Sequence, residues 1–415
     1  MLYRARTLVT MTTPPVTDGA VVVRGDAIAA VGGWKEVRRE FGSEDVVDLG
    51  ERILLPGLIN AHCHLDYSTM RNAIGPQRSF TEWIGRINAL KRELDADDYL
   101  KAIAAGFREA RRWGTTTILN IEAFPELLPR LPPPPLRTWW FYEMIDVRQR
   151  IVTDELLAGA LAFFDERSDW LGGFGLSPHA PYTASAELYR LTRDCSRARG
   201  LPWTTHLCES ADEDEMFRHA RGPLHDFLKK LGRPMDDCGA GRSALETLTA
   251  AGALGPECIA VHLNALNEAD FALLAPGGPL HGLSVVHCPL SHFFFGHPEF
   301  PLARLWELDV NLCLGTDSLA SSPSLDLFPR LRALAATAAS AGLALSARER
   351  LATVTLNPAR ALGLTGRLGS IQAGAWADLI ALSDPGDAAG EAVYEAICEN
   401  RTFVDWMLIS GIPIA

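Results

Sequence analysis

The chain has 415 residues, of which 47% are hydrophobic and 22% are charged, and its formal net charge is -12. This length allows one barrel-sized domain or two smaller ones. The acidic balance argues against nonspecific binding to nucleic acid and to an anionic membrane surface. Because the sequence shows neither the apolar core of a signal peptide nor an apolar run of roughly 20 residues, we expect a cytoplasmic protein without a membrane or nucleic-acid partner.

Short alternating runs of apolar and polar residues mark both ends of the chain. GAVVVRGDAIAAVGG lies within residues 1–55, and GRLGSIQAGAWADLIALS and RTFVDWMLISG lie within residues 367–415. Such runs are typical of half-buried strands joined by turns. We therefore predict a small β-sandwich domain built from both termini, with residues 56–366 forming a second domain between its two parts.

Eight apolar, β-rich runs recur between these ends, at 54–60, 115–121, 137–145, 172–178, 201–207, 258–264, 283–289 and 310–316. Helix-like segments follow them. One of these, DADDYLKAIAAGFREARRWG, begins with acidic residues, keeps apolar positions three and four apart, and stops at Gly114. Eight strand–helix alternations over about 300 residues predict an α/β protein with a TIM-like (β/α)8 barrel.

The first run continues as LLPGLINAHCHLD and ends in two histidines. Side chains alternate along a strand, so His62 and His64 point the same way while Cys63 points opposite. Taken alone, the pair also fits two polar residues at a strand end that bond to the backbone. The other strand ends must therefore decide between these interpretations.

Reactive groups of a (β/α)8 barrel lie at the C-terminal ends of its strands. The fifth run brings His206, with Glu209 three residues later, the sixth brings His262 and the eighth is followed by Asp317. Any one of them could be a core residue or a helix cap. Imidazoles and a carboxylate that converge on one barrel mouth, however, suit a transition metal such as zinc or iron(II), and not calcium or magnesium.

The chain resembles the amidohydrolase superfamily, in particular the cytosine-deaminase-like branch that includes nucleoside deaminases and s-triazine hydrolases. The matching motifs stand in the right order over nearly the full length: PGLINAHCH, SPHAPYT, THLCES, VHLN, HCPLSH, LGTDS and NPARALGL. The stretch from HCPLSHFFFGHPEFPL to LGTDSLAS is also similar to aminodeoxyfutalosine deaminases. The barrel and the composite β-domain of this superfamily agree with the element pattern.

The resemblance implies roles for the strand-end residues. By this resemblance the metal ligands are His62, His64, His206 and Asp317. Glu209 is the general acid/base, His262 holds the attacking water, and Asp317 also accepts a proton. Superfamily members with two metals use a lysine on the fourth strand, where this chain has His179. We therefore expect one divalent ion per chain, with zinc the first choice and iron(II) the second.

The favoured reaction is hydrolytic deamination of an amino-substituted heterocycle. Two alternatives stay open: another leaving group, as in triazine hydrolases or cytosine- and guanine-type deaminases, and a non-catalytic scaffold. Adenosine-type relatives usually carry W-x-x-x-x-x-P-x-E after the first strand, whose Glu grips the ribose hydroxyls. Here Trp83 lacks that Pro-x-Glu, and Lys91 and Arg92 stand near the acidic position.

Basic side chains at that position suit a carboxylate on the substrate. The best single expectation is therefore an adenosine-derived nucleoside such as 6-amino-6-deoxyfutalosine. The candidate substrate-binding residues are His179, Lys91, Arg92 and Ser318. The expected partner is this small molecule, and a second copy of the chain is compatible with the sequence.

Overall fold

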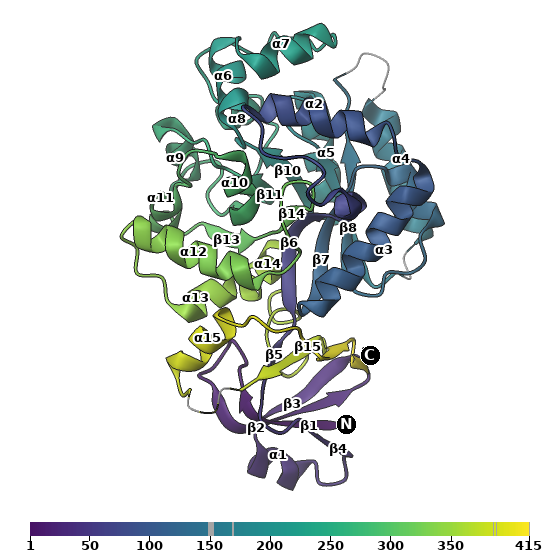
Figure 1. Ribbon diagram of the computed structural model, residues 1–415, viewed down its shortest axis with the longest axis vertical. Coiled ribbons are helices and arrows are strands. Elements are labelled where there is room, and N and C mark those ends of the chain that lie inside the picture. Colours follow the sequence, from purple (N-terminus) through teal and green to yellow (C-terminus); the bar gives the residue numbers. More distant parts are fainter. Residues whose placement is uncertain (148–152, 168–169, 385, 387, 415) are drawn as a thin grey trace. The chain divides into compact units, whose positions relative to one another are not determined.

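The computed structural model describes residues 1–147, 153–167, 170–384, 386 and 388–414 (Figure 1). The chain forms two compact units. One consists of Met1–Ala61, Phe107–Ile118 and Leu325–Ala415, and the other of His62–Gly106 and Leu119–Ser324. The domain bounds expected from the sequence, at residues 55 and 366, stay a prediction.

A nine-stranded sheet forms the predicted barrel, and its strands follow one another in chain order. Its pairs β8 with β9, β10 with β9 and β11, and β12 with β11 and β13 are parallel. The strands are β6 (Leu58–His64), β7 (Thr115–Glu122), β8 (Arg137–Met144), β9 (Gly172–Pro178), β10 (Trp203–Leu207), β11 (Cys258–His262), β12 (Ser284–His287), β13 (Asn311–Leu314) and β14 (Asp317–Ser318).

The eighth barrel strand is interrupted, and its two segments close the ring. β13 pairs with β12, whereas β14 pairs in parallel with β6, so that Asp317 lies opposite Cys63. Between the segments, the Thr316 N–H donates to the carbonyl of His62 at 2.9 Å. The interruption therefore places the first and last strand ends side by side.

Helices lie outside the barrel strands, as Figure 1 shows for α3, α4 and α9. The helix end predicted at Gly114 is confirmed, because α3 stops just before it. Gly200 caps α5 with φ 66°. The helices are α2 (Phe80–Lys91), α3 (Ala96–Arg112), α4 (Thr153–Glu166), α5 (Ala186–Arg199), α6 (Ala211–His219), α7 (Pro223–Lys230), α8 (Ala244–Ala250), α9 (Glu268–Leu274), α10 (Pro289–Phe295), α11 (Leu302–Glu307), α12 (Phe328–Ser340), α13 (Ala347–Ala352), α14 (Leu356–Ala361) and α15 (Glu391–Cys398). Two short 3-10 helices, η1 (Leu65–Met70) and η2 (Pro125–Arg130), follow β6 and β7.

The run expected as one strand at 54–60 divides between two sheets. Arg52–Pro56 is β5 of the terminal sheet, and β6 begins at Leu58. Gly57 lies at the division, where an added Cβ would come within 2.1 Å of Thr116 Oγ1. Proline offers no N–H for a ladder and glycine permits this close approach, so the pair separates the strands.

A mixed eight-stranded sheet draws its strands from both ends of the chain, as predicted, and carries α1 (Trp34–Glu40). β1 pairs antiparallel with β2 and parallel with β5, and β15 pairs antiparallel with β5. The strands are β1 (Leu2–Leu8), β2 (Val16–Arg24), β3 (Ala27–Gly33), β4 (Val46–Asp48), β5 (Arg52–Pro56), β15 (Leu379–Ser383), β16 (Trp406–Ile409) and β17 (Ile412–Pro413).

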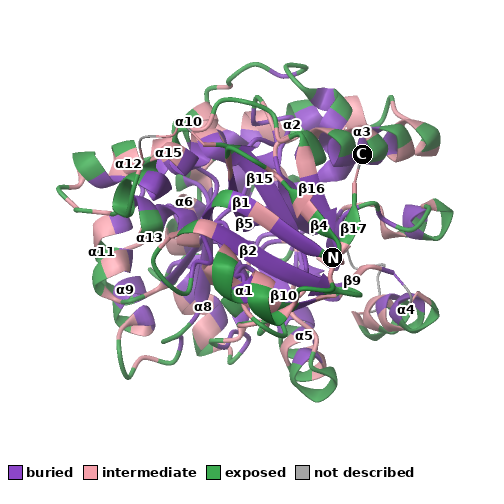
Figure 2. Ribbon diagram, turned by 90° about the horizontal axis from the view of Figure 1, so that it is seen from below, coloured by how far each residue is buried: buried purple, intermediate pink, exposed green. Residues whose placement is uncertain are grey.

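Side chains that alternate along β2 pack into two different hydrophobic cores. Val21 and Val23 pack with residues of the C-terminal segment such as Leu379 and Leu408, while Val22 packs with Val37 of α1. In Figure 2 the buried colour accordingly runs along β2, whereas α1 and α5 carry exposed colour. Both faces of this strand therefore bury apolar side chains.

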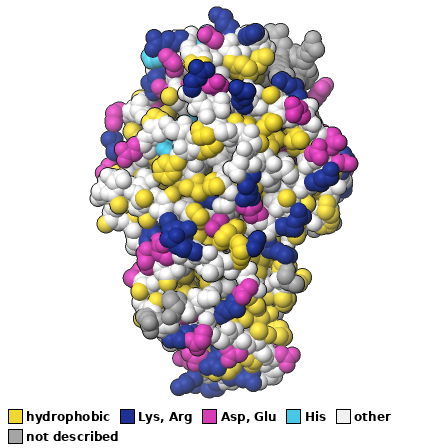
Figure 3. All heavy atoms as spheres, in the orientation of Figure 1, with side chains coloured by type: hydrophobic (Ala, Val, Ile, Leu, Met, Phe, Trp, Pro, Cys, Tyr) yellow, Lys and Arg dark blue, Asp and Glu magenta, His cyan; other side chains and the backbone are white. Residues whose placement is uncertain are grey.

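The surface mixes charges of both signs. On the face shown in Figure 3, basic and acidic side chains alternate, and histidine contributes little. Among the described residues, no helix is both long and apolar enough to cross a membrane.

Candidate active site

The end of β6 directs two buried histidines to one side of the strand. His62 and His64 are 0% and 6% exposed. Cys63 points the other way, with its Sγ 3.8 Å from Asn120 Oδ1. The strand alternation predicted from the sequence thus places two imidazoles toward a common point.

A third imidazole meets them from β10. The Nε2 atoms of His64 and His206 are 3.3 Å apart, and the ring centroids of His62 and His206 are 4.9 Å apart. One ligand nitrogen from each of the three rings lies within 4.8 Å of the others. Strands that are distant in sequence therefore build a cluster able to hold a metal ion.

Asp317 adds a carboxylate beside this cluster. Its Oδ1 lies 3.8 Å from His62 Nε2 and accepts from the Ser318 N–H at 2.7 Å. The hydroxyls of Ser321, at 2.9 Å, and of Ser291 donate to Oδ2. Asp317 has φ 56°, in the left-handed region, where strained residues are often functional. These bonds fix the carboxylate in place.

The unpaired nitrogens of the cluster fit a metal ion. Both ring nitrogens of His62 and Nδ1 of His64 are buried without a hydrogen-bond partner among the described residues. His206 Nδ1 lies 2.9 Å from the carbonyl of His179, so it carries the proton and leaves Nε2 as a lone pair. Burial, with the neighbouring histidines, lowers the pKa of His206 to about 3 and that of His64 well below its usual value.

Neutral imidazoles with free lone pairs plus one carboxylate are the donor set of zinc and iron(II) sites. Burial alone would raise the pKa of Asp317, but the imidazoles of His62 and His262 hold it well below its usual range. The carboxylate is therefore ionised and able to bind a cation. The residues present fit a divalent metal ion.

Glu209 and His262 form a second pair next to the cluster. His262 ends β11, and its Nε2 lies 3.5 Å from Glu209 Oε1. Burial first, and then the charge of Asp317, raise the pKa of Glu209 well above its usual range. The raised pKa favours the protonated form of Glu209, which is the form that a general acid requires. Both residues are predicted from the sequence, and the structure brings them together.

Glu213, which sequence analysis missed, holds the backbone of this segment. Its Oε2 accepts from the Glu209 N–H at 2.8 Å and its Oε1 from the Cys208 N–H at 3.0 Å. Asn264 Nδ2 also donates to the Glu209 carbonyl at 3.0 Å. Glu213 lies in the first turn of α6, four residues after Glu209, a spacing that was visible in THLCESADE.

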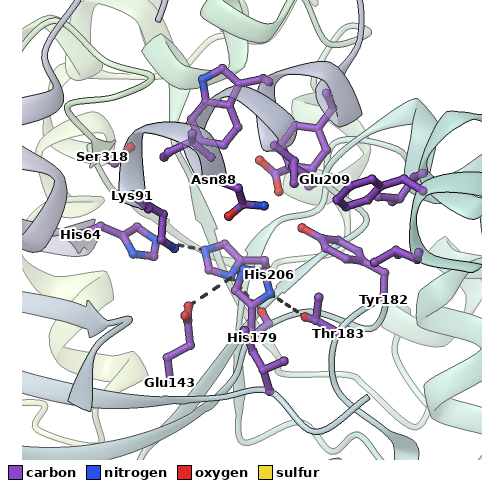
Figure 4. Close-up of a pocket in the computed structure, with 18 of the residues that line it drawn as sticks. His64, Asn88, Lys91, Glu143, His179, Tyr182, Thr183, His206, Glu209 and Ser318 are labelled. Atoms are coloured by element: carbon purple, nitrogen blue, oxygen red, sulfur yellow. Dashed lines mark hydrogen bonds and ion pairs between the residues drawn. The ribbon is translucent and has the colours of Figure 1, made fainter. Parts of the chain in front are cut away.

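These groups open into a cavity of about 380 Å³ (Figure 4). Two walls differ in composition. The strand wall consists of residues at or just after strand ends: His64, Glu143, His179, His206, Glu209, His262, Asp317 and Ser318. The helix wall consists of apolar residues of α2 and α7: Phe80, Trp83, Ile84, Ile87, Leu224, Phe227 and Leu228.

Three of the four predicted substrate-binding residues line the cavity, namely His179, Lys91 and Ser318. Arg92 caps the C-terminus of α2, is exposed, and is not among the lining residues. Lys91 Nζ donates to Tyr67 Oη at 2.7 Å. The Tyr67 ring stacks on His64 with centroids 5.5 Å apart, so Lys91 reaches the edge of the metal cluster.

Two buried carboxyl groups beside Lys91 were also missed. Glu143 lies near the end of β8, and burial raises its pKa while the charge of Lys91 opposes the rise. Asp66 follows β6, and burial raises its pKa to about 8, again opposed by Lys91. The strand-end rule that predicts His206 would also find Glu143, which lies one residue before the end of β8.

Comparisons with known proteins agree with this architecture. The Amidohydrolase family matches residues 53–406. The 5-methylthioadenosine/S-adenosylhomocysteine deaminase of Pyrococcus furiosus is 30% identical over 372 residues, which cover 87% of this chain and 83% of that protein. Two solved structures are similar over nearly the whole chain.

The zinc-bound adenosine deaminase of Xanthomonas campestris has a TM-score of 0.80 and 26% identity, covering 99% of this chain and 92% of the other. Helicobacter pylori aminofutalosine deaminase with methylthio-coformycin has a TM-score of 0.87 and 19% identity, and the match covers 100% of both chains. The second likeness concerns the fold alone.

Proposed function

This chain belongs to the amidohydrolase family and is a hydrolase of carbon–nitrogen bonds, and we propose that it removes the amino group of an adenosine-derived nucleoside as ammonia. The observation that carries the proposal is the Glu209–His262 pair, 3.5 Å apart, beside the histidine cluster in one cavity. The cavity's volume of about 380 Å³ is within the usual range for small-molecule sites. Relatives named as adenosine-type deaminases support the substrate class.

We assign His62, His64, His206 and Asp317 to one divalent ion, with zinc favoured over iron(II). The donor set supports this, as does the bound zinc of the Xanthomonas campestris enzyme. When bound, such an ion acts as a Lewis acid and lowers the pKa of water to about 7.

The chain's own residues carry the protons. Neutral His262 holds the attacking water by a hydrogen bond, and the Asp317 carboxylate accepts its proton. Glu209 donates its proton to the ring nitrogen beside the amino-bearing carbon. A carbon–oxygen bond forms, and the Glu209 carboxylate takes the proton of the new hydroxyl as the carbonyl forms. Glu209 passes this proton to the amine, the carbon–nitrogen bond breaks, and ammonia leaves. The proton held by Asp317 then returns to Glu209, which restores both groups.

The finer choice of nucleoside concerns the group at the 5′ carbon. The helix wall, with Trp83, Ile87 and Phe227, offers apolar surface to a methylthio group or to an aromatic ring. We retain 6-amino-6-deoxyfutalosine as the best single expectation. The substrate named for the Pyrococcus furiosus enzyme, 5-methylthioadenosine, is the comparison.

The test is ammonia release by zinc-loaded protein from a panel of amines. The panel contains 6-amino-6-deoxyfutalosine, 5-methylthioadenosine, 5′-deoxyadenosine and adenosine, with cytosine, guanine and an aminotriazine as competitors. We expect the adenosine derivatives to have the highest kcat/KM, and the Glu209→Gln protein to control for contaminating deaminases. Faster turnover of cytosine, guanine or the triazine would contradict the proposal.

A further inference from the structure

Two hydrogen-bond acceptors face each other on the strand wall. Glu143 Oε1 and His179 Nε2 are 4.0 Å apart. The other ring nitrogen of His179, Nδ1, lies 2.6 Å from Thr183 Oγ1, and the Thr183 hydroxyl donates to the Ala180 carbonyl at 3.2 Å. Nδ1 therefore carries the proton of the neutral ring, and Nε2 presents a lone pair toward Glu143.

A donor stands on the opposite element. Lys91 Nζ, on α2, uses one of its three N–H groups for Tyr67 Oη. Figure 4 shows Lys91, Glu143 and His179 lying around the same part of the cavity, next to His64 and His206. The gap between Glu143 and His179 is too long for a hydrogen bond, so a group that donates to one of these acceptors and itself accepts from an ammonium fits there. A hydroxyl is such a group, and because it has one O–H to donate, two neighbouring hydroxyls are needed to satisfy both acceptors.

We propose that Glu143, together with His179 and Lys91, binds the vicinal hydroxyls of the substrate's ribose. This inference rests on the proposed function, because the ribose belongs to the nucleoside. A carboxylate can accept from two neighbouring hydroxyls, one at each oxygen. The helix after the first strand lacks the Pro-x-Glu that would supply an acidic grip, so the grip comes from β8.

A metal ion is the competing occupant. Ligand atoms of Glu143, His179 and His206 also lie within 4.8 Å of one another. However, His206 has only Nε2 to offer, because Nδ1 donates to the His179 carbonyl, and that nitrogen already faces His64 at 3.3 Å. The nearby positive charge of Lys91 also opposes a second cation. A hydroxyl therefore fits this place better than an ion.

The experiment compares kcat/KM for adenosine and 2′,3′-dideoxyadenosine in wild type, Glu143→Ala and Glu143→Gln. Hydrogen bonds to charged groups predict that wild type prefers adenosine by about tenfold to a hundredfold. We expect Glu143→Ala to lose most of this preference and Glu143→Gln, which keeps the side-chain shape, to lose part of it. Glu126→Ala, an exposed position on η2, is the control and should keep the wild-type ratio.

A binding measurement separates recognition from chemistry. Calorimetry with the products inosine and 2′,3′-dideoxyinosine should show the same loss of discrimination in the Glu143 variants. The inference is overturned if both variants keep the wild-type ratio of adenosine to dideoxyadenosine kcat/KM, or if wild type does not prefer adenosine. In either case, turnover of adenosine would still support the proposed function. Loss of a metal equivalent in Glu143→Ala also overturns the inference. Absence of any nucleoside deamination would instead overturn the proposed function.

Discussion

The strand wall and the helix wall of the cavity are built by different forces. On the strand wall, ladder hydrogen bonds fix the register that sets Leu207 opposite His262 and Ser318 opposite His64. On the helix wall, apolar side chains are held by packing and by the Ser79 cap at the start of α2. Polar chemistry needs positions fixed to a fraction of an ångström, whereas apolar contact tolerates repacking. Substitutions of the metal-binding and proton-transferring residues on the strand wall should therefore affect catalysis, and substitutions on the helix wall should affect affinity.

The largest expected effect of a strand-wall substitution comes from removing a histidine of the metal cluster. In His206→Ala we expect metal content to fall sharply from about one equivalent per chain, and turnover to fall to background, since one of three imidazole ligands is lost. Metal analysis of the purified protein and ammonia release measure the two effects. Two tightly held equivalents in wild type would contradict the single-ion assignment.

A smaller loss should follow from Glu209→Gln, which keeps the shape but removes the transferable proton. We expect kcat to fall by about 10²–10⁴ while metal content and the unfolding temperature stay at wild-type values. If the amide variant turned over at the wild-type rate, Glu209 would be only a carboxyl group at the start of a helix. Glu187→Gln, in the first turn of α5, is the matched control for a helix-start carboxyl without a catalytic neighbour.

Glu213, the buried residue that holds the backbone of the strand wall, should affect how the free energy of unfolding depends on pH. Burial raises the pKa of Glu213 from 4.5 to about 7, although the Glu209 and Cys208 N–H groups oppose the rise. The folded state then binds more protons than the unfolded state between these values, so this group makes stability fall as pH rises through the interval. The full effect is about 3 kcal/mol.

Glu213→Gln cannot titrate, so its free energy of unfolding should lack this descending part. Denaturant unfolding of both proteins from pH 4.5 to pH 8 measures the difference. The advantage of wild type over the variant should shrink steadily up to about pH 7 and then stay level. Parallel curves over the whole interval would mean that Glu213 titrates with the same pKa in both states.

The sequence predicts the strand wall better than the helix wall, for physical reasons. Period-two alternation orients His62 and His64 without any tertiary information, and the strand-end rule locates His206 and Asp317. The division at Gly57 escaped prediction because Pro56 and Gly57 stand inside a continuous apolar run, and only the approach of Thr116 shows that two sheets meet there.

Predicting the helix wall from the sequence requires knowing which face of α2 turns toward the cavity. Its lining residues Phe80, Trp83, Ile84, Ile87, Asn88 and Lys91 are spaced three and four apart, so the helical period was present in the sequence. That period places Lys91 on the cavity face and the next residue, Arg92, about 100° away. The two basic residues look equivalent by charge alone, but the geometry separates them: Lys91 lines the cavity and Arg92 is exposed.

The smallest expected effect comes from this neighbouring pair. Lys91→Met should raise KM for nucleosides about tenfold to a hundredfold, because a charged donor is lost, whereas exposed Arg92→Met should leave KM unchanged. Measured with 6-amino-6-deoxyfutalosine and its methyl ester, the same variants locate the lost contact. If Lys91 binds ribose hydroxyls, acid and ester lose equally in Lys91→Met. If Lys91 binds the substrate carboxylate, as the two basic residues indicate from the sequence, KM rises in Lys91→Met for the acid alone. Glu143 would then bind the ribose hydroxyls without help from the Lys91 ammonium.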